Sequence, residues 1–214
     1  APLMRLAGKA DVYAPTRAHA LTALARLKSV DALPLATALV NATPRKVGRA
    51  AFAVIAASPV HWTVPSIAFG LRTPGLRSAA ALAAIANPHA DLGPIALAAA
   101  LGADLTPDER EAMLGAIGKI GPAGAATKLL TRIEKADRKE LIALMKTLPQ
   151  LGDRTIVPKL VRYLPHAEPE VAKFVVYALE NVTGKRLGMD IPAWHRFAGL
   201  DEDGAPAGGR AATP

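Results

Sequence analysis

The sequence predicts an all-α fold, a right-handed α-solenoid of five to six helical hairpins. Three observations predict it. Apolar residues recur at helical spacing within short stretches. Helix-start signals return regularly, near positions 16, 44, 74, 106, 137 and 168. Alanine supplies much of the 51% hydrophobic fraction, whereas aromatic residues make up only 4%, and alanine has the highest helix propensity. One short helix pair cannot bury its own apolar stripe, so the pattern indicates a stack of pairs.

The clearest unit lies between Asp153 and Trp194. Its second helix follows Glu168 and carries six apolar residues on one face, because they fall at i, +3, +4, +7, +8 and +11. Gly184 comes just after the last of them and is a typical helix end. The preceding helix has Pro158 near its start, where the missing N–H costs little. The inward residues expected are Val157, Leu160, Val161 and Leu164, then Val171, Phe174, Val175, Ala178, Leu179 and Val182.

The N-terminal half contains weaker copies of this unit. Residues 1–15 have no strong period, and we expect a partial helix or an arm there. The first pair is predicted at 16–28 and about 33–40. The second pair opens at Pro44 and its second helix at Val64-Pro65; the third opens at Pro74 and its second helix at Gly93-Pro94.

The remaining units have sharper boundaries. The fourth begins with Thr106 as N-cap, Pro107 in the first turn and Glu109 at the position that closes a capping box. After Gly121-Pro122 a helix follows with Ala126, Leu129, Leu130 and Ile133 inward. The fifth unit begins near Asp137, and the sixth at Glu168. We therefore divide the chain into an arm (1–15), a repeat array (16–197) and a disordered tail (198–214), which is rich in Gly, Pro, Ala and acid.

These units resemble HEAT repeats of the bacterial kind. The run GDRTIVPKL from Gly152 to Leu160 is similar to the family's turn and second-helix opening, and Val171 through Leu179 to its first helix. A third similarity is to the segment that often closes such arrays, and it is carried by Val182-Thr183-Gly184, Gly188, Asp190 and Trp194. The resemblance implies a scaffold, assembly factor or adaptor, although a minority of HEAT-like proteins are DNA glycosylases or bilin lyases. The N-terminal repeats lack the family's usual Asp/Arg pairs.

Charge is distributed unevenly. The net charge is +8, of which residues 1–103 contribute +7, from ten Lys or Arg and three Asp. A basic half favours an acidic partner, although a solvated face would have the same composition. There are no cysteines, which excludes disulfides and thiolate metal sites. No apolar run is long enough for a membrane span. We expect a soluble protein, with the cytoplasm favoured over the periplasm.

Six residues are candidates for partner binding. Arg45, Lys46 and Arg49 form the best basic cluster, and successive repeats are expected to align it with Arg72 and Arg77 as a ridge. Arg72 suits the dipole of a helix C-terminus, whereas Arg45 and Lys46 at a helix start do not. Trp62 lies in a turn, where an exposed Trp is either an interface anchor or a cap between neighbouring turns.

The histidines give little indication of a metal site. His61 and His89 occupy corresponding turns of adjacent repeats, so we expect them to lie near one another. A pair without an obvious carboxylate neighbour is a weak metal candidate, and we predict no metal ligands and no cofactor. The chain also lacks a phosphate loop, a nucleophile elbow and a His-Glu-x-x-His motif, so we predict no catalytic residues.

The favoured function is a non-enzymatic scaffold or adaptor that holds a protein partner, an acidic one if the basic half takes part, within a larger complex. The alternative is a nucleic-acid-binding HEAT-like protein that uses the basic N-terminal half; the aromatic residues typical of single-strand binders are missing there, but a duplex-backbone reader fits. A third hypothesis is a lyase or other enzyme subunit that acts only in a complex, and the only support for it is that some members of the HEAT-like family are enzymes.

Overall fold

A computed structural model describes residues 2–201 and is helical throughout. The chain is 72% helix, with thirteen α-helices and no strand among the residues that the structure describes. This confirms the predicted all-α class. The chain divides into two compact units, residues 1–122 and residues 123 onward.

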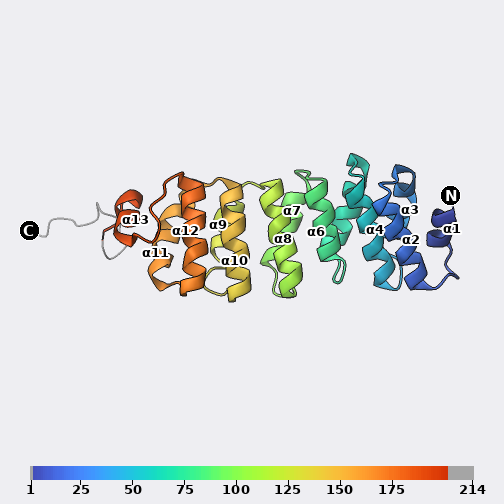
Figure 1. Ribbon diagram of the computed structural model, residues 1–214, viewed down its shortest axis with the longest axis horizontal. Coiled ribbons are helices and arrows are strands. Elements are labelled where there is room, and N and C mark those ends of the chain that lie inside the picture. The colour runs from blue at the N-terminus through green and yellow to red at the C-terminus, as the bar shows by residue number, and fades with distance from the viewer. Residues whose placement is uncertain (1, 202–214) are drawn as a thin grey trace, which may run out of the picture. The chain divides into compact units, whose positions relative to one another are not determined.

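The N-terminal unit contains helices α1 to α8 (Figure 1). Their bounds are α1 Pro2–Gly8, α2 Ala14–Arg26, α3 Leu33–Leu39, α4 Arg45–Ala57, α5 Val64–Arg72, α6 Arg77–Ala86, α7 Leu92–Leu101 and α8 Pro107–Ile120. The even-numbered helices α2, α4, α6 and α8 pack against one another in sequence order, and α5 packs against α7. Each of α3, α5 and α7 also packs against the even-numbered helix that follows it. Each of these helices therefore buries part of its surface against its neighbours.

The fourth residue of each even-numbered helix lies against the end of the preceding helix. In α2 it is Arg17, whose Nε donates to the carbonyl of Ala7 at 3.0 Å. In α8 it is Arg110, whose guanidinium donates to the carbonyls of Ala100 and Gly102 at 2.5 and 3.1 Å. The last carbonyls of a helix have no partner within the helix. The buried side chains of Arg17 and Arg110 supply a hydrogen-bond donor to such carbonyls from the next helix in the series.

The middle pairs meet at the same position by close approach instead. The fourth residue of α4 is Gly48, and a Cβ placed there would lie 2.4 Å from the carbonyl oxygen of Val40, the residue that follows α3. The fourth residue of α6 is Ala80, whose Cβ would lie 2.6 Å from a Cβ built on Gly70 in α5. Small residues at these contacts let the backbones touch.

Three of the second helices begin in the same way. A short 3-10 turn precedes α3 (Val30–Ala32), α5 (His61–Thr63) and, in the C-terminal unit, α11 (Arg154–Ile156). Each helix then has proline as its second residue, where no intrahelical N–H bond is lost. The predicted starts at Pro34, Pro65 and Pro158 are confirmed. The α7 helix instead starts at Leu92, with Pro94 as its third residue.

The C-terminal unit contains α9 Ala125–Leu130, α10 Arg138–Thr147, α11 Val157–Tyr163, α12 Pro169–Thr183 and α13 Ile191–Ala198. The α10 helix packs on α12, and α11 packs on both α12 and α13. Arg138 pairs with Glu170 between α10 and α12, and Arg132 forms two bonds to Glu140 at 2.9 and 3.1 Å. Trp194 is fully buried and donates from Nε1 to the carbonyl of Gly188 at 2.9 Å.

The predicted helix boundaries agree best where a cap is encoded locally. Thr106 and Glu109 form the predicted capping box, and Glu109 also accepts from the backbone N–H of Gly75 at 3.2 Å. Gly121 and Gly184 end α8 and α12 in the left-handed conformation. The predicted start at Pro74 is three residues too early, because Gly75 has a φ of 77° and the chain turns there before α6 begins at Arg77.

Both predicted end segments are partly ordered. Within 1–15, α1 packs on α2 and the first residues of α2 are already helical. In 198–214, Gly199 caps α13, Leu200 is buried and His195 Nδ1 donates to the carbonyl of Asp201 at 2.7 Å. The remainder of the predicted tail, 202–214, lies outside the described residues.

We predict that Gly48→Ala destabilises the protein by about 1–3 kcal/mol, the usual cost of overpacking. The new Cβ would lie 2.4 Å from a backbone oxygen at the end of α3, and backbone cannot rotate away as a side chain can. Urea unfolding followed by circular dichroism measures the change.

Gly115→Ala is the matched control. It also lies inside a helix of the N-terminal unit, but its nearest neighbour is Ile85 Cδ1 at 3.4 Å, an ordinary contact. Because alanine is the better helix former by up to about 1 kcal/mol, this variant should be as stable as the wild type or more so. Equal losses in both variants would contradict the proposed close approach.

Candidate functional site

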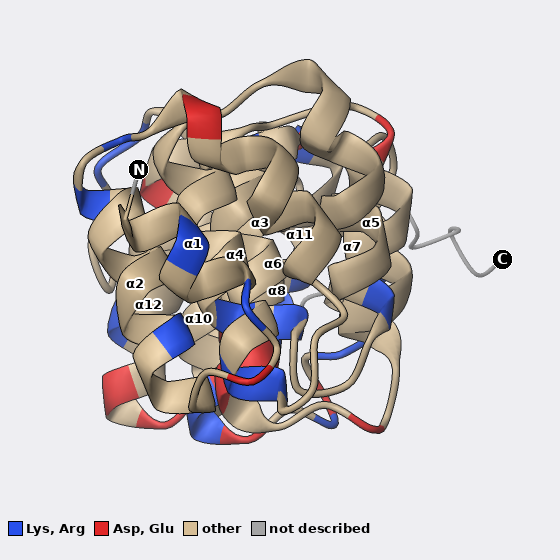
Figure 2. Cartoon of the chain, turned by 90° about the vertical axis from the view of Figure 1, so that its right-hand side faces the viewer, with Lys and Arg blue, Asp and Glu red and all other residues tan. Residues whose placement is uncertain are grey.

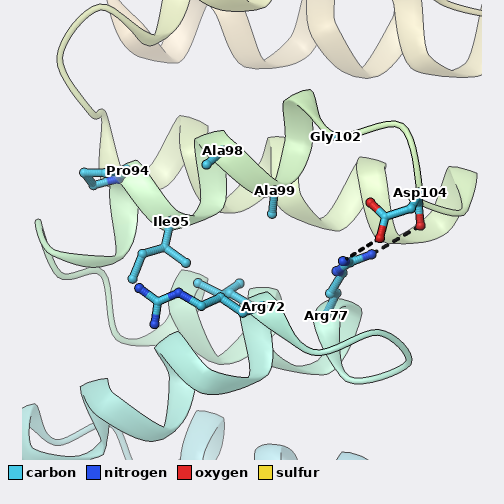
Figure 3. A pocket seen from close by; sticks show the side chains of 9 residues that line it. Arg72, Arg77, Pro94, Ile95, Ala98, Ala99, Gly102 and Asp104 are labelled. Carbon is cyan, nitrogen blue, oxygen red and sulfur yellow. Dashed lines mark hydrogen bonds and ion pairs between the residues drawn. The ribbon is translucent and has the colours of Figure 1, made fainter.

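A groove of about 420 Å³ lies in the N-terminal unit between α5 and α7. Most of its wall is apolar and comes from the end of α5 and the outer side of α7. Figure 3 shows two arginines at its edge: Arg72 reaches toward Ile95, and Arg77 is joined to Asp104 at the opposite end. The lining residues are Leu71, Arg72, Arg77, Pro94, Ile95, Ala98, Ala99, Gly102 and Asp104. An apolar wall with a few charged groups is the usual composition of a ligand-binding groove.

Arg77 has a partner within the chain. Its side chain is only 9% exposed, and its guanidinium donates to the Asp104 carboxylate at 2.9 Å and to the Asp104 backbone carbonyl at 3.2 Å. The Arg77 hydrogen bond holds the pKa of Asp104 below its ordinary value, and the positive charges of Arg77 and Arg110 act in the same direction. The sequence prediction that Arg77 belongs to an exposed basic ridge is therefore corrected. It anchors the segment after α7 to the start of α6.

Arg72 is the free cation of this groove. It is the last residue of α5 and is exposed. Among the residues that the structure describes, it has no ion pair and no side-chain hydrogen bond. Figure 3 shows its guanidinium on the side of the groove away from Asp104. The charge is therefore available to an anionic group that enters the groove.

The other predicted basic residues lie on a different helix. Arg45, Lys46 and Arg49 are all exposed in the first turns of α4. Arg45 donates to the Asn41 side-chain oxygen at 2.8 Å. None of the three lines the groove beside Arg72. The structure thus brings Arg72 and Arg77 together in one groove and leaves the α4 cluster as a separate exposed group.

Trp62 lies in the 3-10 turn before α5 and is 52% exposed. This exposure fits the anchor alternative better than a role as a cap. Its neighbour His61 contacts His89 across the stack, with 2.9 Å between their Nε2 atoms. The predicted proximity of the two histidines is confirmed.

Sequence reasoning missed a second groove, in the C-terminal unit. It has a volume of about 520 Å³ and is lined by Ile133, Glu134, Lys159, Arg162, Tyr163 and His166. Burial, and to a lesser degree the Glu168 charge, raise the pKa of Tyr163. A sequence signal was present, because Lys159, Arg162, Tyr163 and His166 recur at helical spacing from α11 into the turn after it.

The apolar wall of the first groove was missed because the sequence carries no signal for it. Residues 92–101 are apolar on all sides, so periodicity does not show which face of α7 is exposed. In Figure 2 the charged positions lie mostly at helix ends and in the connecting segments. The sides of the helices are largely uncharged, which leaves surfaces such as the α7 wall open to apolar contact.

Comparison with known proteins gives no indication of what these grooves bind. No protein-family profile matches the chain, and no curated protein matches it either. None of the helices within residues 2–201 is long and apolar enough to cross a membrane. The fold and the grooves define an all-α protein of packed helix pairs.

We predict that Asp104→Asn makes the stability of the protein less dependent on acid pH. The folded-state pKa of Asp104 is below its ordinary value of 3.8, so the ionised form is favoured by folding. Its contribution is complete above about pH 4 and is lost as the pH falls through the lower folded-state value. Urea unfolding over a pH series measures it.

The wild type should exceed Asp104→Asn in stability at neutral pH, and the difference should shrink as the pH falls below 3.8. Asp11→Asn, which removes a carboxylate at an exposed residue before α2, is the control. A difference between wild type and Asp104→Asn that stayed constant with pH would show that the pair does not shift the titration.

Proposed function

We propose that the chain is a non-enzymatic protein-binding module, a right-handed α-solenoid of five to six HEAT-like hairpins that works as a scaffold or adaptor in a larger complex. The recurring contact of each even-numbered helix with the end of the preceding one supports the repeat architecture. The observation that carries the function is the groove beside Arg72, where a free guanidinium stands at the edge of an apolar wall.

The occupant that fits this groove is a peptide segment with an aliphatic side chain close to a carboxylate. Ile95, Ala98 and Ala99 offer the aliphatic side chain a dry contact, and Arg72 offers the carboxylate a planar pair of donors. Arg77 is already satisfied by Asp104, whose own side chain is 69% exposed. Asp104 therefore repels an anion at its end of the groove, which sets the direction of the bound segment.

Charge complementarity supports an acidic partner. Residues 1–103 carry a net charge of +7, and such a field raises the rate at which acidic segments associate. Trp62 and the α4 cluster of Arg45, Lys46 and Arg49 add exposed contact groups in the same unit. Exposed Trp and Arg are the residues most enriched among interface hot spots.

We predict that peptides selected from a random library against the wild-type chain carry Asp or Glu near Leu or Ile, and that Arg72→Glu weakens the best of them about ten- to a hundredfold. That range follows from losing a hydrogen bond to a charged group, worth about 1.5–3 kcal/mol. Ala98→Glu, which puts bulk and negative charge on the exposed wall of α7, should weaken binding as well. Fluorescence anisotropy measures both.

Arg49→Ala is the matched control, because it removes an exposed arginine of the same unit that does not line the groove. Unchanged affinity in Arg72→Glu and Ala98→Glu would disprove the groove as the binding site. Loss only in Arg45→Glu/Lys46→Glu/Arg49→Glu would place the site on α4. Tight binding of duplex DNA with a steep salt dependence would favour the nucleic-acid alternative.

A further inference from the structure

Two histidines from successive turns face one another through their Nε2 atoms. His61 begins the 3-10 turn before α5, and His89 lies in the turn before α7. The Nε2 atoms are 2.9 Å apart, and the ring centroids are 4.6 Å apart with an interplanar angle of 67°. If the two rings pointed straight at each other, the distance between their centroids would equal the 2.9 Å separation plus the radius of each ring. The observed centroid distance is shorter than that. The rings are therefore tilted, and the Nε2 lone-pair directions lie at an angle to the line that joins the two nitrogen atoms.

The two turns that carry the pair are fixed to each other. The Asn87 side-chain amide donates to the carbonyl of Val60 at 3.0 Å and to the Thr63 hydroxyl at 3.3 Å. Thr63 is fully buried and donates to the same carbonyl at 2.7 Å. Asn87 therefore connects the turn before α7 to the turn before α5. This connection holds the two histidines close together, and neither of them lines the groove beside Arg72.

Asp91 supplies the carboxylate that the sequence pattern did not reveal. Its backbone N–H lies 3.3 Å from His89 Nδ1 and its carboxylate Oδ2 lies 3.5 Å from the same atom. When Nδ1 accepts from the backbone, His89 Nε2 carries the proton and donates it to His61. When the proton is on Nδ1 instead, the Asp91 carboxylate, 3.5 Å from Nδ1, attracts it electrostatically, and both Nε2 lone pairs become free. Metal-binding histidines are commonly oriented by a carboxylate in this way.

The spacing of the Nε2 atoms also suits a metal ion. With metal–nitrogen bonds of about 2.0–2.1 Å, two ligands at a right angle lie about 2.9 Å apart, whereas two ligands of a tetrahedral ion lie about 3.3–3.4 Å apart. The observed 2.9 Å matches the first arrangement. Right-angled nitrogen ligands are typical of tetragonal Ni²⁺ and Cu²⁺ sites.

We propose that His61 and His89 form an open binding site for a divalent transition metal ion of the Ni²⁺ or Cu²⁺ type. Each imidazole gives one ligand through Nε2, and metal binding moves the His89 proton to Nδ1, 3.5 Å from the Asp91 carboxylate. Among the described residues no third His, Asp or Glu completes the set. Water or a side chain of a bound partner takes the remaining positions. The ion links two turns that are 28 residues apart in sequence.

We predict that the tag-free full chain binds one Ni²⁺ in isothermal titration calorimetry, and that His61→Ala and His89→Ala each weaken this binding at least about tenfold. Asp91→Asn should weaken it about tenfold as well, in line with the usual effect of a carboxylate partner. Trp62 follows His61 in the chain and is 52% exposed, so bound Ni²⁺ should quench its fluorescence. Trp62→Phe should abolish the quenching and leave the calorimetric binding unchanged.

His19→Ala and His166→Ala are matched controls, because both remove an exposed histidine outside the pair. They should bind Ni²⁺ as the wild type does. Circular dichroism checks that the exposed His61→Ala variant is folded. The proposal is overturned if the wild type does not bind Ni²⁺, or if His61→Ala and His89→Ala bind it as tightly as the wild type.

Discussion

The N-terminal unit depends on the contact between the first turn of each even-numbered helix and the end of the helix before it. The fourth residue makes that contact in every case, at Arg17, Gly48, Ala80 and Arg110. These positions are 31, 32 and 30 residues apart. The last carbonyls of a helix lack a partner within the helix. The two arginines donate to such carbonyls, whereas the two small residues only leave room for the backbones to come close.

The packing of α5 on α7 determines where the surface groups lie. It brings the end of α5 beside the exposed side of α7, so that Arg72 stands at the edge of an apolar wall. The turn before α5 also lies beside the turn before α7, and Asn87 joins them. Arg72 is therefore carried by a packed helix, and His61 and His89 lie in two turns that Asn87 joins. Groups held in this way are suited to recognition, because little order has to be gained on binding.

Much of the fold was readable from local chemistry. Pro107, Glu109 and Gly121 encode the beginning and end of α8 without help from the tertiary structure, and the prolines at the second helical position mark α3, α5 and α11. The equivalence of two turns was enough to predict that His61 and His89 approach each other. The pairing of Arg77 with Asp104 was missed, because the two are 27 residues apart and only the tertiary structure brings them together. The wall formed by Ile95 and Ala98 was missed because an alanine-rich helix shows no apolar face.

The alanine-rich core has a thermal consequence. The buried residues of α6 are chiefly alanines, and Gly48 and Gly70 lie where an added Cβ would meet neighbouring atoms within 2.4 Å. Small side chains lose little or no rotamer entropy on burial, and they also expose little apolar surface on unfolding. Because the heat capacity of unfolding rises with the apolar surface exposed, this protein should have a low heat-capacity change per residue. Its stability would then vary little with temperature, over a broader range than in a domain of equal size built on leucine and phenylalanine.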